Sequence, residues 1–292
     1  MTPGASPTPP NGDLDESRLK IYFLPNLLTA GNLFCGFVAL TKIVEADPLS
    51  PHFSAQIKLA LAFILLACIF DLFDGRVARM GGAESPFGRE FDSLADLISF
   101  GAAPAFLVHR IVLKDVFIKY AEFGWFIASI YLICGAFRLA RFNVFSAEGV
   151  GGGSKDFLGF PIPSAAGLVA SLTLFMIWMT EIGWLEERFS QSRWRYVLPV
   201  LLLFLSWMMV SKVRYPSFKS LGFRATRTFT KTLVAVLFIG GVLILQEKLL
   251  YWALPLFFTS YLIYGFVRPH ISRRIRKEIE EEEEDDDDPT SA

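Results

Sequence analysis

The sequence has little of the chemistry that disulfide-bonded and zinc-binding proteins use. It contains three cysteines and three histidines among 292 residues. The cysteines lie in apolar stretches and no Cys-x-x-Cys spacing occurs, so we expect neither a disulfide framework nor a thiolate metal site. The histidines are scattered and form no ligand cluster. The glycine-rich run at 148–156 lacks the Gly-Lys-Ser/Thr ending of a phosphate-binding loop, which excludes that kind of nucleotide site.

Charge is also scarce, and hydrophobic residues take its place. Charged residues make up 20% of the chain, hydrophobic residues 53%, and the mean hydropathy is +0.43. This balance is typical of membrane proteins. No segment resembles a cleavable signal peptide and no internal repeat is visible. Residues 1–17 are rich in proline and serine, so we expect a disordered segment ahead of an uncleaved first span.

Long apolar stretches recur along the whole chain. A bilayer-crossing helix needs roughly 20 mostly apolar residues, and the last three stretches are short by that measure, which leaves six or seven spans as alternatives to eight. The sequence therefore predicts an all-α, polytopic membrane protein. The predicted spans are 21–44, 57–79, 88–113, 123–144, 160–182, 196–212, 230–246 and 249–267.

Positive charge is distributed unevenly between the two sides of these spans. The net charge of −1 is misleading, because a run of glutamate and aspartate near the end of the chain holds many of the acids. Of the 28 lysines and arginines, nineteen fall on the side of the N-terminus and nine on the other side. The positive-inside rule therefore predicts an inner-membrane protein with both termini in the cytoplasm. We expect the acidic tail to be solvated and disordered.

Four aspartates interrupt the apolar pattern between the second and third spans. Asp71 and Asp74 share a helix face at about 100° per residue, and Asp92 and Asp96 share another face one turn apart. Two glycines and a Ser-Pro pair between them can reverse the chain, so the two acidic faces can meet across a helical hairpin. Converging carboxylates repel one another unless a cation lies between them. Oxygen ligands suit Mg²⁺ or Mn²⁺, and four carboxylates can hold two ions.

An alternative is that these acids only form ion pairs with Arg76, Arg79 and Arg89. Against it, Asp71 lies roughly 12 Å along the helix from Arg79, at about 1.5 Å per residue, with an apolar run on its membrane side. A charge at that depth costs about 2.5–3.5 kcal/mol on insertion scales, so a functional role is the better explanation.

The spacing of this hairpin resembles the signature of the CDP-alcohol phosphatidyltransferases. It reads Asp71-x-x-Asp74-Gly75-x-x-Ala78-Arg79, eight residues, then Gly88-x-x-x-Asp92-x-x-x-Asp96. The resemblance implies that the four aspartates bind two divalent ions at the CDP diphosphate and that Asp96 is the catalytic base. It also implies a nucleotide site, where residues without bulk let the nucleotide approach the helix backbone. The residues so assigned are Asn26, Thr29, Gly75, Ala78, Arg79 and Gly88.

Two further stretches resemble the phosphatidylserine synthase branch of that family. The first is Asn32–Phe37, which follows the Pro25-Asn26-x-x-Thr29 segment of the first span; helix–helix hydrogen bonding is the alternative role for these polar residues. The second joins Arg-Leu-Ala-Arg-Phe-Asn at 138–143 to Gly-Phe-Pro-Ile-Pro-Ser-Ala-Ala at 159–166. Here Arg138, Arg141 and Asn143 are candidates for holding the serine carboxylate or the lipid phosphate. A positive-inside anchor is the alternative role for the two arginines.

Together these resemblances imply the reaction of CDP-diacylglycerol with L-serine to give phosphatidylserine and CMP. They imply a six-helix core, commonly a homodimer, with about two additional C-terminal helices. We expect a catalytic core at 18–213, a basic loop and additional helices at 214–269, and a disordered tail at 270–292. We expect membrane lipids as partners and no nucleic acid. Glycerol 3-phosphate, an inositol phosphate or choline as acceptor is the alternative within the family, and an ion-coupled transporter is the alternative outside it.

Overall fold

The computed structural model describes residues 16–80, 85–117, 120–147, 156–185, 196–216 and 247–267. Helices account for nearly all of these residues, with two short strands. In chain order the elements are α1 (Glu16–Glu45), α2 (Phe53–Met80), α3 (Pro86–Asp96), η1 (Leu97–Ala102), α4 (Ala103–Val108), η2 (His109–Leu113), α5 (Lys114–Val116), α6 (Ala121–Ala147), β1 (Asp156–Leu158), α7 (Ile162–Glu181), α8 (Val197–Val210), β2 (Arg214–Pro216) and α10 (Glu247–Val267).

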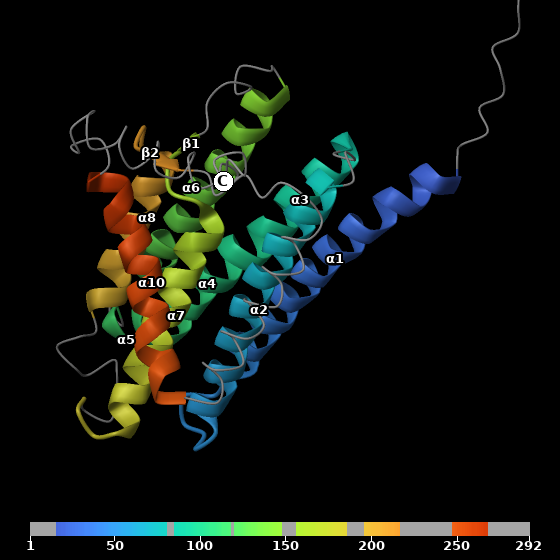
Figure 1. The fold of residues 1–292 in the computed structure, drawn as a ribbon. Coiled ribbons are helices and arrows are strands. Elements are labelled where there is room, and N and C mark those ends of the chain that lie inside the picture. The colour runs from blue at the N-terminus through green and yellow to red at the C-terminus, as the bar shows by residue number, and fades with distance from the viewer. Residues whose placement is uncertain are drawn as a thin grey trace, which may run out of the picture.

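The long helices run up and down as a bundle (Figure 1). α1 packs along α2, α6 packs against α8, and α7 lies between α2 and α10. A small residue also lets α1 approach η1: Gly36 of α1 faces Ser99 so closely that a Cβ on Gly36 would lie 2.7 Å from the Ser99 Cα. The core is built from alanine, leucine and isoleucine of all these helices together with buried Phe100, Tyr131 and Phe160.

The third membrane segment is one continuous run of helix with two π-helical sections. α3, η1, α4, η2 and α5 follow one another without a break from Pro86 to Val116. A π-helical section widens the helix by one residue per turn and is often found at functional sites. The first section begins directly after Asp96, so it changes the register of the residues that follow Asp96 and leaves Asp92 and Asp96 together in the regular helix α3.

The turn into α3 is fixed by a serine cap. The Gly88 backbone N–H donates to Ser85 Oγ at 2.9 Å, and Pro86 occupies the first turn, where its missing N–H costs nothing. Residues 81–84, which connect α2 to this cap, lie outside the described residues. The second half of the predicted hairpin therefore begins where the sequence places its Ser-Pro pair.

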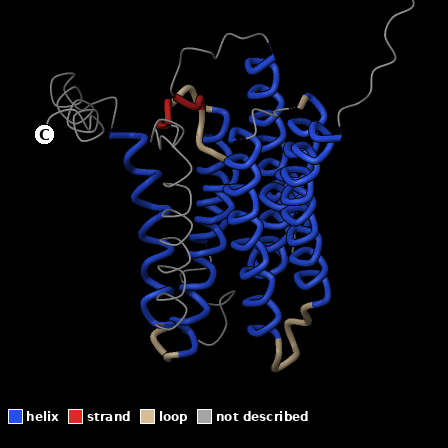
Figure 2. Tube along the Cα trace, turned by 45° about the vertical axis from the view of Figure 1, so that its right-hand side comes forward, coloured by secondary structure: helices blue, strands red, loops and turns tan. Residues whose placement is uncertain are grey.

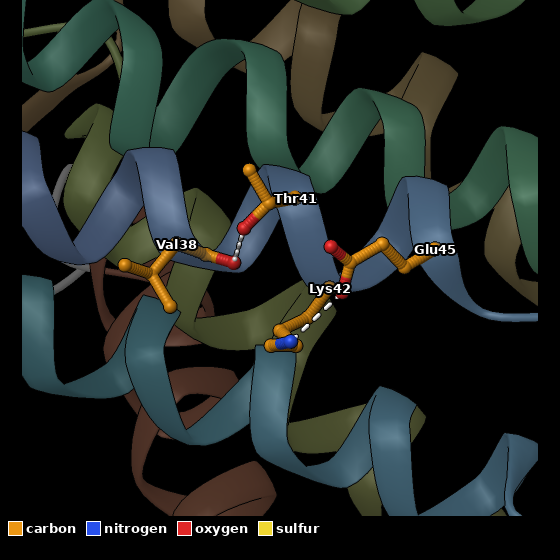
Figure 3. A network of polar contacts seen from close by, with 4 residues as sticks. All are labelled: Val38, Thr41, Lys42 and Glu45. Carbon is orange, nitrogen blue, oxygen red and sulfur yellow. Dashed lines mark hydrogen bonds and ion pairs between the residues drawn. The ribbon is translucent and has the colours of Figure 1, made fainter.

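Polar contacts fasten the end of the bundle where α1 runs into α2. The Arg110 guanidinium donates to the Ala46 carbonyl just after α1, with its Nε at 3.1 Å. Lys58 of α2 pairs with Glu181 at the end of α7, at 2.6 Å. Figure 3 shows the last turns of α1, where Lys42 pairs with Glu45 at 2.8 Å and Thr41 donates to the Val38 carbonyl. None of these contacts involves the predicted site residues.

A short antiparallel strand pair lies at the opposite end of the bundle (Figure 2). β1 pairs with β2, with Phe157 opposite Tyr215. Gly159 follows β1 with φ of +79°, and its N–H donates to the Val213 carbonyl at 2.8 Å. Only glycine adopts this conformation without strain, so the chain turns here from β1 into α7. The sequence did not predict this pair, because three-residue strands carry no periodic signal.

The prediction of an all-α polytopic membrane protein is confirmed. Among the described residues five helical segments are long and apolar enough to cross a membrane: Pro25–Glu45, Phe53–Val77, Pro86–Val116, Glu122–Ser146 and Ile162–Glu181. α8 is a shorter apolar helix, α10 has 21 residues, and the predicted span at 230–246 lies outside the described residues. The number of spans therefore stays a prediction.

The predicted domain boundaries also stay predictions. α1 begins at Glu16, two residues inside the segment predicted to be disordered, and helix ends commonly differ by that much between definitions. Residues 1–15, the basic loop from 217 onward and the tail from 268 onward lie outside the described residues.

Candidate active site

Three of the four predicted aspartates converge at one end of the bundle. Carboxylate oxygens of Asp71, Asp74 and Asp92 all lie within 4.8 Å of one another. Asp71 and Asp74 come from α2 and Asp92 comes from α3, so the site forms only when the two helices pack. Asp74 is buried, with 4% of its surface exposed, and the other two are half-buried. The facing acidic helices expected from the sequence are therefore present.

Thr29 of α1 completes this cluster from a third helix. Its hydroxyl lies 3.0 Å from Asp74 Oδ2 and 3.1 Å from the Pro25 carbonyl, and it can donate its single proton to either oxygen. When it donates to Asp74, the carboxylate is held in one rotamer with its other oxygen left for a ligand. Thr29, a predicted nucleotide-site residue, thus contacts one of the predicted metal ligands directly.

Asp96 stands outside the set of three and has its own partner. Its Oδ1 accepts a hydrogen bond from Asn32 Nδ2 at 3.0 Å, and both side chains are buried, with 5% and 0% of their surfaces exposed. Ser99 donates to the Asn32 carbonyl at 2.9 Å, which ties α1 to η1 at the same level. The sequence marked Asn32 as a polar residue needing a partner in an apolar helix and as the start of the Asn32–Phe37 resemblance, but not as a site residue. Its contact with Asp96 makes it a site residue.

The donor set fits a hard divalent cation. The three converging groups are carboxylates from two helices, and no sulfur or imidazole ligand belongs to the cluster. Buried like charges this close repel strongly, and a cation between them removes the repulsion. Mg²⁺ and Mn²⁺ favour oxygen ligands of this kind. Among the described residues the cluster therefore has the chemistry of a metal site.

Arg138 of α6 is a buried cation next to the aspartates. Only 9% of its surface is exposed, and its Nε has no hydrogen-bond partner. The charges of Asp96 and Asp71 both act on its guanidinium. A buried N–H without a partner is costly, so a partner from a bound molecule would stabilise it. Arg138 therefore has the position and the spare donor expected of an anion-binding residue.

Arg141 lies one turn further along α6 and makes different contacts. Its Nη1 donates to the Val210 carbonyl at 3.1 Å, and its Nη2 lies 2.9 Å from the Leu158 carbonyl and 3.2 Å from that of Met209. Positive charge at the C-terminal carbonyls of a helix is favourable. Arg141 thus fastens the end of α8 and the strand β1 to α6, and these backbone contacts engage both of its terminal nitrogens.

Asn143, the third residue of that predicted group, joins α6 to α3. Its Nδ2 donates to Ser93 Oγ at 3.0 Å and to Glu90 Oε2 at 3.2 Å. Ser93 lies one residue after Asp92, so this bridge fixes α3 at the level of the acidic cluster.

The remaining predicted nucleotide residues lie around the same end of the bundle. A Cβ on Gly88 would come within 3.3 Å of Asn26 Oδ1, so the absence of a side chain lets α1 approach the start of α3. Gly75 is half-buried in α2 beside Asp74. Ala78 and Arg79 are in the last turn of α2, and their side chains lie outside the described part of the chain.

Comparison with known proteins shows the family of this chain. The chain belongs to the CDP-alcohol phosphatidyltransferase family, whose model matches residues 22–213. That match begins inside α1, ends at the residue before β2 and contains every predicted site residue.

Individual relatives fall in one branch of that family. The chain is 32% identical over 248 residues to a CDP-diacylglycerol–serine O-phosphatidyltransferase of Helicobacter pylori, covering 85% of this chain and 91% of the relative. It is 32% identical over 201 residues to the enzyme of the same name from Bacillus subtilis, covering 68% and 92%. It is also 30% identical over 210 residues to the archaetidylserine synthase of Methanothermobacter thermautotrophicus, covering 71% and 76%. The resemblance noted in the sequence is confirmed.

Proposed function

We propose that this protein transfers a phosphatidyl group from CDP-diacylglycerol to L-serine and releases CMP. The observation that carries the proposal is the convergence of the Asp71, Asp74 and Asp92 carboxylates, together with the buried guanidinium of Arg138 on α6. A cluster made only of carboxylates can bind a diphosphate through metal ions. A buried arginine with an N–H that has no hydrogen-bond partner can bind the carboxylate of an amino acid acceptor. Serine as the acceptor is further supported by the names of the relatives described above.

Two divalent ions, Mg²⁺ or Mn²⁺, fit the donor set of the site. Asp71, Asp74 and Asp92 would hold them, with Asp96 as a further ligand. When bound, such ions neutralise the charge of the diphosphate and stabilise the CMP leaving group. Thr29 keeps Asp74 in one rotamer, so the ligand geometry exists before substrate arrives.

Asp96 is proposed as the general base. It is buried, lies apart from the three clustered oxygens, and is oriented by Asn32. It accepts the proton of the serine hydroxyl as the serine oxygen forms a bond to the phosphorus of the phosphatidyl group. The bond from that phosphorus to the oxygen of CMP breaks, and CMP carries away its electron pair. Asp96 then releases the proton to solvent.

Around this centre the other predicted residues position the substrates. Arg138 would hold the serine carboxylate or the lipid phosphate through its free N–H. Gly75 and Gly88 would let the nucleotide approach the backbones of α2 and α3, near Asn26. Ala78 and Arg79 are proposed for the same nucleotide site on the motif alone. Asn143 supports the site through α3, and Arg141 through α8 and β1.

The site is proposed to face the cytoplasm, where CDP-lipid head groups and serine are accessible. The end of α2, the start of α3 and the end of α6 lie at one end of the bundle (Figure 1). This is the end to which the uneven distribution of lysine and arginine assigns the cytoplasm. An inner-membrane location with both termini inside, and a homodimer as the working unit, complete the proposal.

The test is CMP release by the purified protein in detergent with CDP-diacylglycerol and a panel of acceptors. Serine is expected to give the highest rate, with EDTA abolishing it and Mg²⁺ or Mn²⁺ restoring it. A higher rate with glycerol 3-phosphate, an inositol phosphate or choline would reassign the acceptor. Full turnover in EDTA would overturn the metal assignment, and an absence of CMP release with every acceptor would favour the ion-coupled transporter.

A further inference from the structure

Asn32 carries a buried acceptor atom that no donor in the described part of the chain satisfies. Its side chain is 0% exposed, and its Oδ1 has no hydrogen-bond partner there. Turning the carboxamide over does not help, because Nδ2 donates to Asp96 Oδ1 at 3.0 Å and two oxygens would then face each other. The backbone is held as well, since Ser99 donates to the Asn32 carbonyl at 2.9 Å. A buried acceptor without a donor is costly, so a bound molecule that supplies a donor would be stabilised here.

A second unpaired polar atom, Arg138 Nε, lies at the same level of the bundle. Helix α6 packs on α3 and η1, and two hydrogen bonds join them, one on each side of Arg138 along α6. They run from Tyr131 Oη to the Phe100 carbonyl, 3.1 Å, and from Asn143 Nδ2 to Ser93 Oγ, 3.0 Å. The helices are therefore antiparallel, and Asp96 lies between the two acceptors as Arg138 lies between the two donors. An unpaired donor and an unpaired acceptor thus reach the level of Asp96 from two different helices, α6 and α1.

These three side chains match the three polar groups of serine. In the proposed function Asp96 accepts the hydroxyl proton, and the Nε–H of Arg138 suits the carboxylate. Asn32 Oδ1 needs a donor, and an ammonium group supplies N–H donors together with a positive charge that the neighbouring Asp96 attracts. Serine carries its hydroxyl and its ammonium on adjacent carbon atoms. One serine molecule can therefore reach both Asp96 and the Asn32 carboxamide that is hydrogen-bonded to it.

We propose that Asn32 is a specificity-determining residue whose Oδ1 accepts a hydrogen bond from the ammonium group of the acceptor, so that the site selects an amino alcohol. The inference rests on the proposed function, which gives the serine hydroxyl to Asp96 and the serine carboxylate to Arg138. The ammonium keeps all its protons, and only the hydroxyl proton moves, to Asp96. Choline has no N–H to donate, and glycerol 3-phosphate and an inositol phosphate offer only uncharged hydroxyls, which are weaker donors. The contact therefore disfavours each alternative acceptor.

The first experiment removes the ammonium from the acceptor and its partner from the protein. The acceptor analogue is 3-hydroxypropionate, which is serine without its ammonium, and it competes with labelled serine for conversion into lipid. Asn32→Ala should raise the KM for serine about tenfold and leave the competition constant of 3-hydroxypropionate within a factor of two. A poorer orientation of Asp96 affects both acceptors alike, because both present the hydroxyl. An unchanged serine KM, or an equal rise in both constants, would overturn the inference.

The second experiment uses ethanolamine, which keeps the ammonium and lacks the carboxylate. Its competition constant should rise about tenfold in Asn32→Ala and stay within a factor of two in Arg138→Lys. The opposite dependence would overturn the inference. Ser99→Ala, which is equally buried and contacts only the Asn32 backbone, is the matched control and should leave all three constants unchanged.

Two further substitutions of Asn32 separate lost recognition from lost folding. Asn32→Leu keeps nearly the same shape without polar atoms and should repeat the effect of Asn32→Ala. Asn32→Asp keeps an oxygen at the place of Oδ1, so it should lower kcat and hold the serine KM within a factor of two. A serine KM raised as much in Asn32→Asp as in Asn32→Leu would overturn the inference. Absence of lipid product with every acceptor would overturn the proposed function itself, whereas serine turnover with the wrong pattern among these variants overturns only the role of Asn32.

Discussion

Asn32→Ala is the most direct test of how this fold prepares its catalytic carboxylate. Asn32 lies in the middle of α1 and donates to Asp96 Oδ1 at 3.0 Å, with both side chains buried. Alanine removes the donor and leaves α1 helical, because alanine has the highest helix propensity. After the substitution Asp96 lacks the hydrogen bond by which Asn32 holds its Oδ1.

The magnitude follows from the kind of hydrogen bond that is lost. A hydrogen bond to a charged group contributes about 1.5–3 kcal/mol, more than the 0.5–1.5 kcal/mol typical of a neutral pair. If that free energy serves to orient Asp96 for proton transfer, its loss lowers kcat by roughly ten- to a hundredfold. We expect KM for CDP-diacylglycerol to change little, because Asp71, Asp74 and Asp92 keep their convergence.

The assay is CMP release at saturating substrates, with thermal unfolding in detergent measured alongside. Ser99→Ala is the matched control: Ser99 donates to the Asn32 backbone carbonyl and is equally buried, but no hydrogen bond joins it to Asp96. The kcat of Ser99→Ala should stay near that of the wild type, although its melting temperature should fall by about as much as that of Asn32→Ala. A kcat for Asn32→Ala equal to that of the control would refute the reasoning, since Asp96 would then need no orientation by Asn32.

Three further predictions follow from the same geometry. Asp96→Asn should lose turnover and keep CDP-lipid binding, whereas Asp71→Ala should lose both. Equilibrium dialysis of the nucleotide distinguishes the two variants. Lost binding in Asp96→Asn would make Asp96 chiefly a metal ligand. Arg138→Lys should raise the KM for serine about ten- to a hundredfold without lowering the melting temperature. Arg141→Lys should instead lower the melting temperature, because it releases three contacts with backbone carbonyls. The reverse pattern would exchange the roles of the two arginines. Gly159→Ala should destabilise the fold by about 1–2 kcal/mol or more, because a residue with a Cβ is strained in this left-handed backbone conformation and the added Cβ would also meet the Met209 carbonyl. An unchanged melting temperature would contradict this prediction.

Two features of this protein were readable from local sequence. Apolar stretches of bilayer length predict membrane helices, because each stretch must satisfy its own backbone in lipid. The acidic cluster was readable as well, since the spacing of Asp71 and Asp74 fixes a shared helix face and the Ser85-Pro86 pair fixes where the next helix starts. Both signals depend only on residues near one another in the chain.

What the sequence did not contain is which of these side chains meet. Asp96 lies one turn after Asp92 in α3, yet it does not belong to the set of three carboxylates whose oxygens lie within 4.8 Å of one another. Its Oδ1 instead accepts a hydrogen bond from Asn32 of α1.

The two arginines of α6 show the same limit. Their spacing of three residues places Arg138 and Arg141 on one helix face, and sequence alone gave them a shared candidate role. In the fold, the Arg138 guanidinium is buried on the side of the aspartates. The Arg141 guanidinium, one helical turn away, donates to carbonyls of α8 and β1.

Sequence by itself thus determined the membrane helices, the acidic motif and the family, since helix length and side-chain spacing are properties of a continuous segment. Only the tertiary structure decided the partners of Asp74 and Asp96 and the different surroundings of Arg138 and Arg141. These depend on contacts between segments as far apart as α1, α3, α6 and α8, and the packing of large and small side chains that sets such contacts leaves no periodic signal in any one segment.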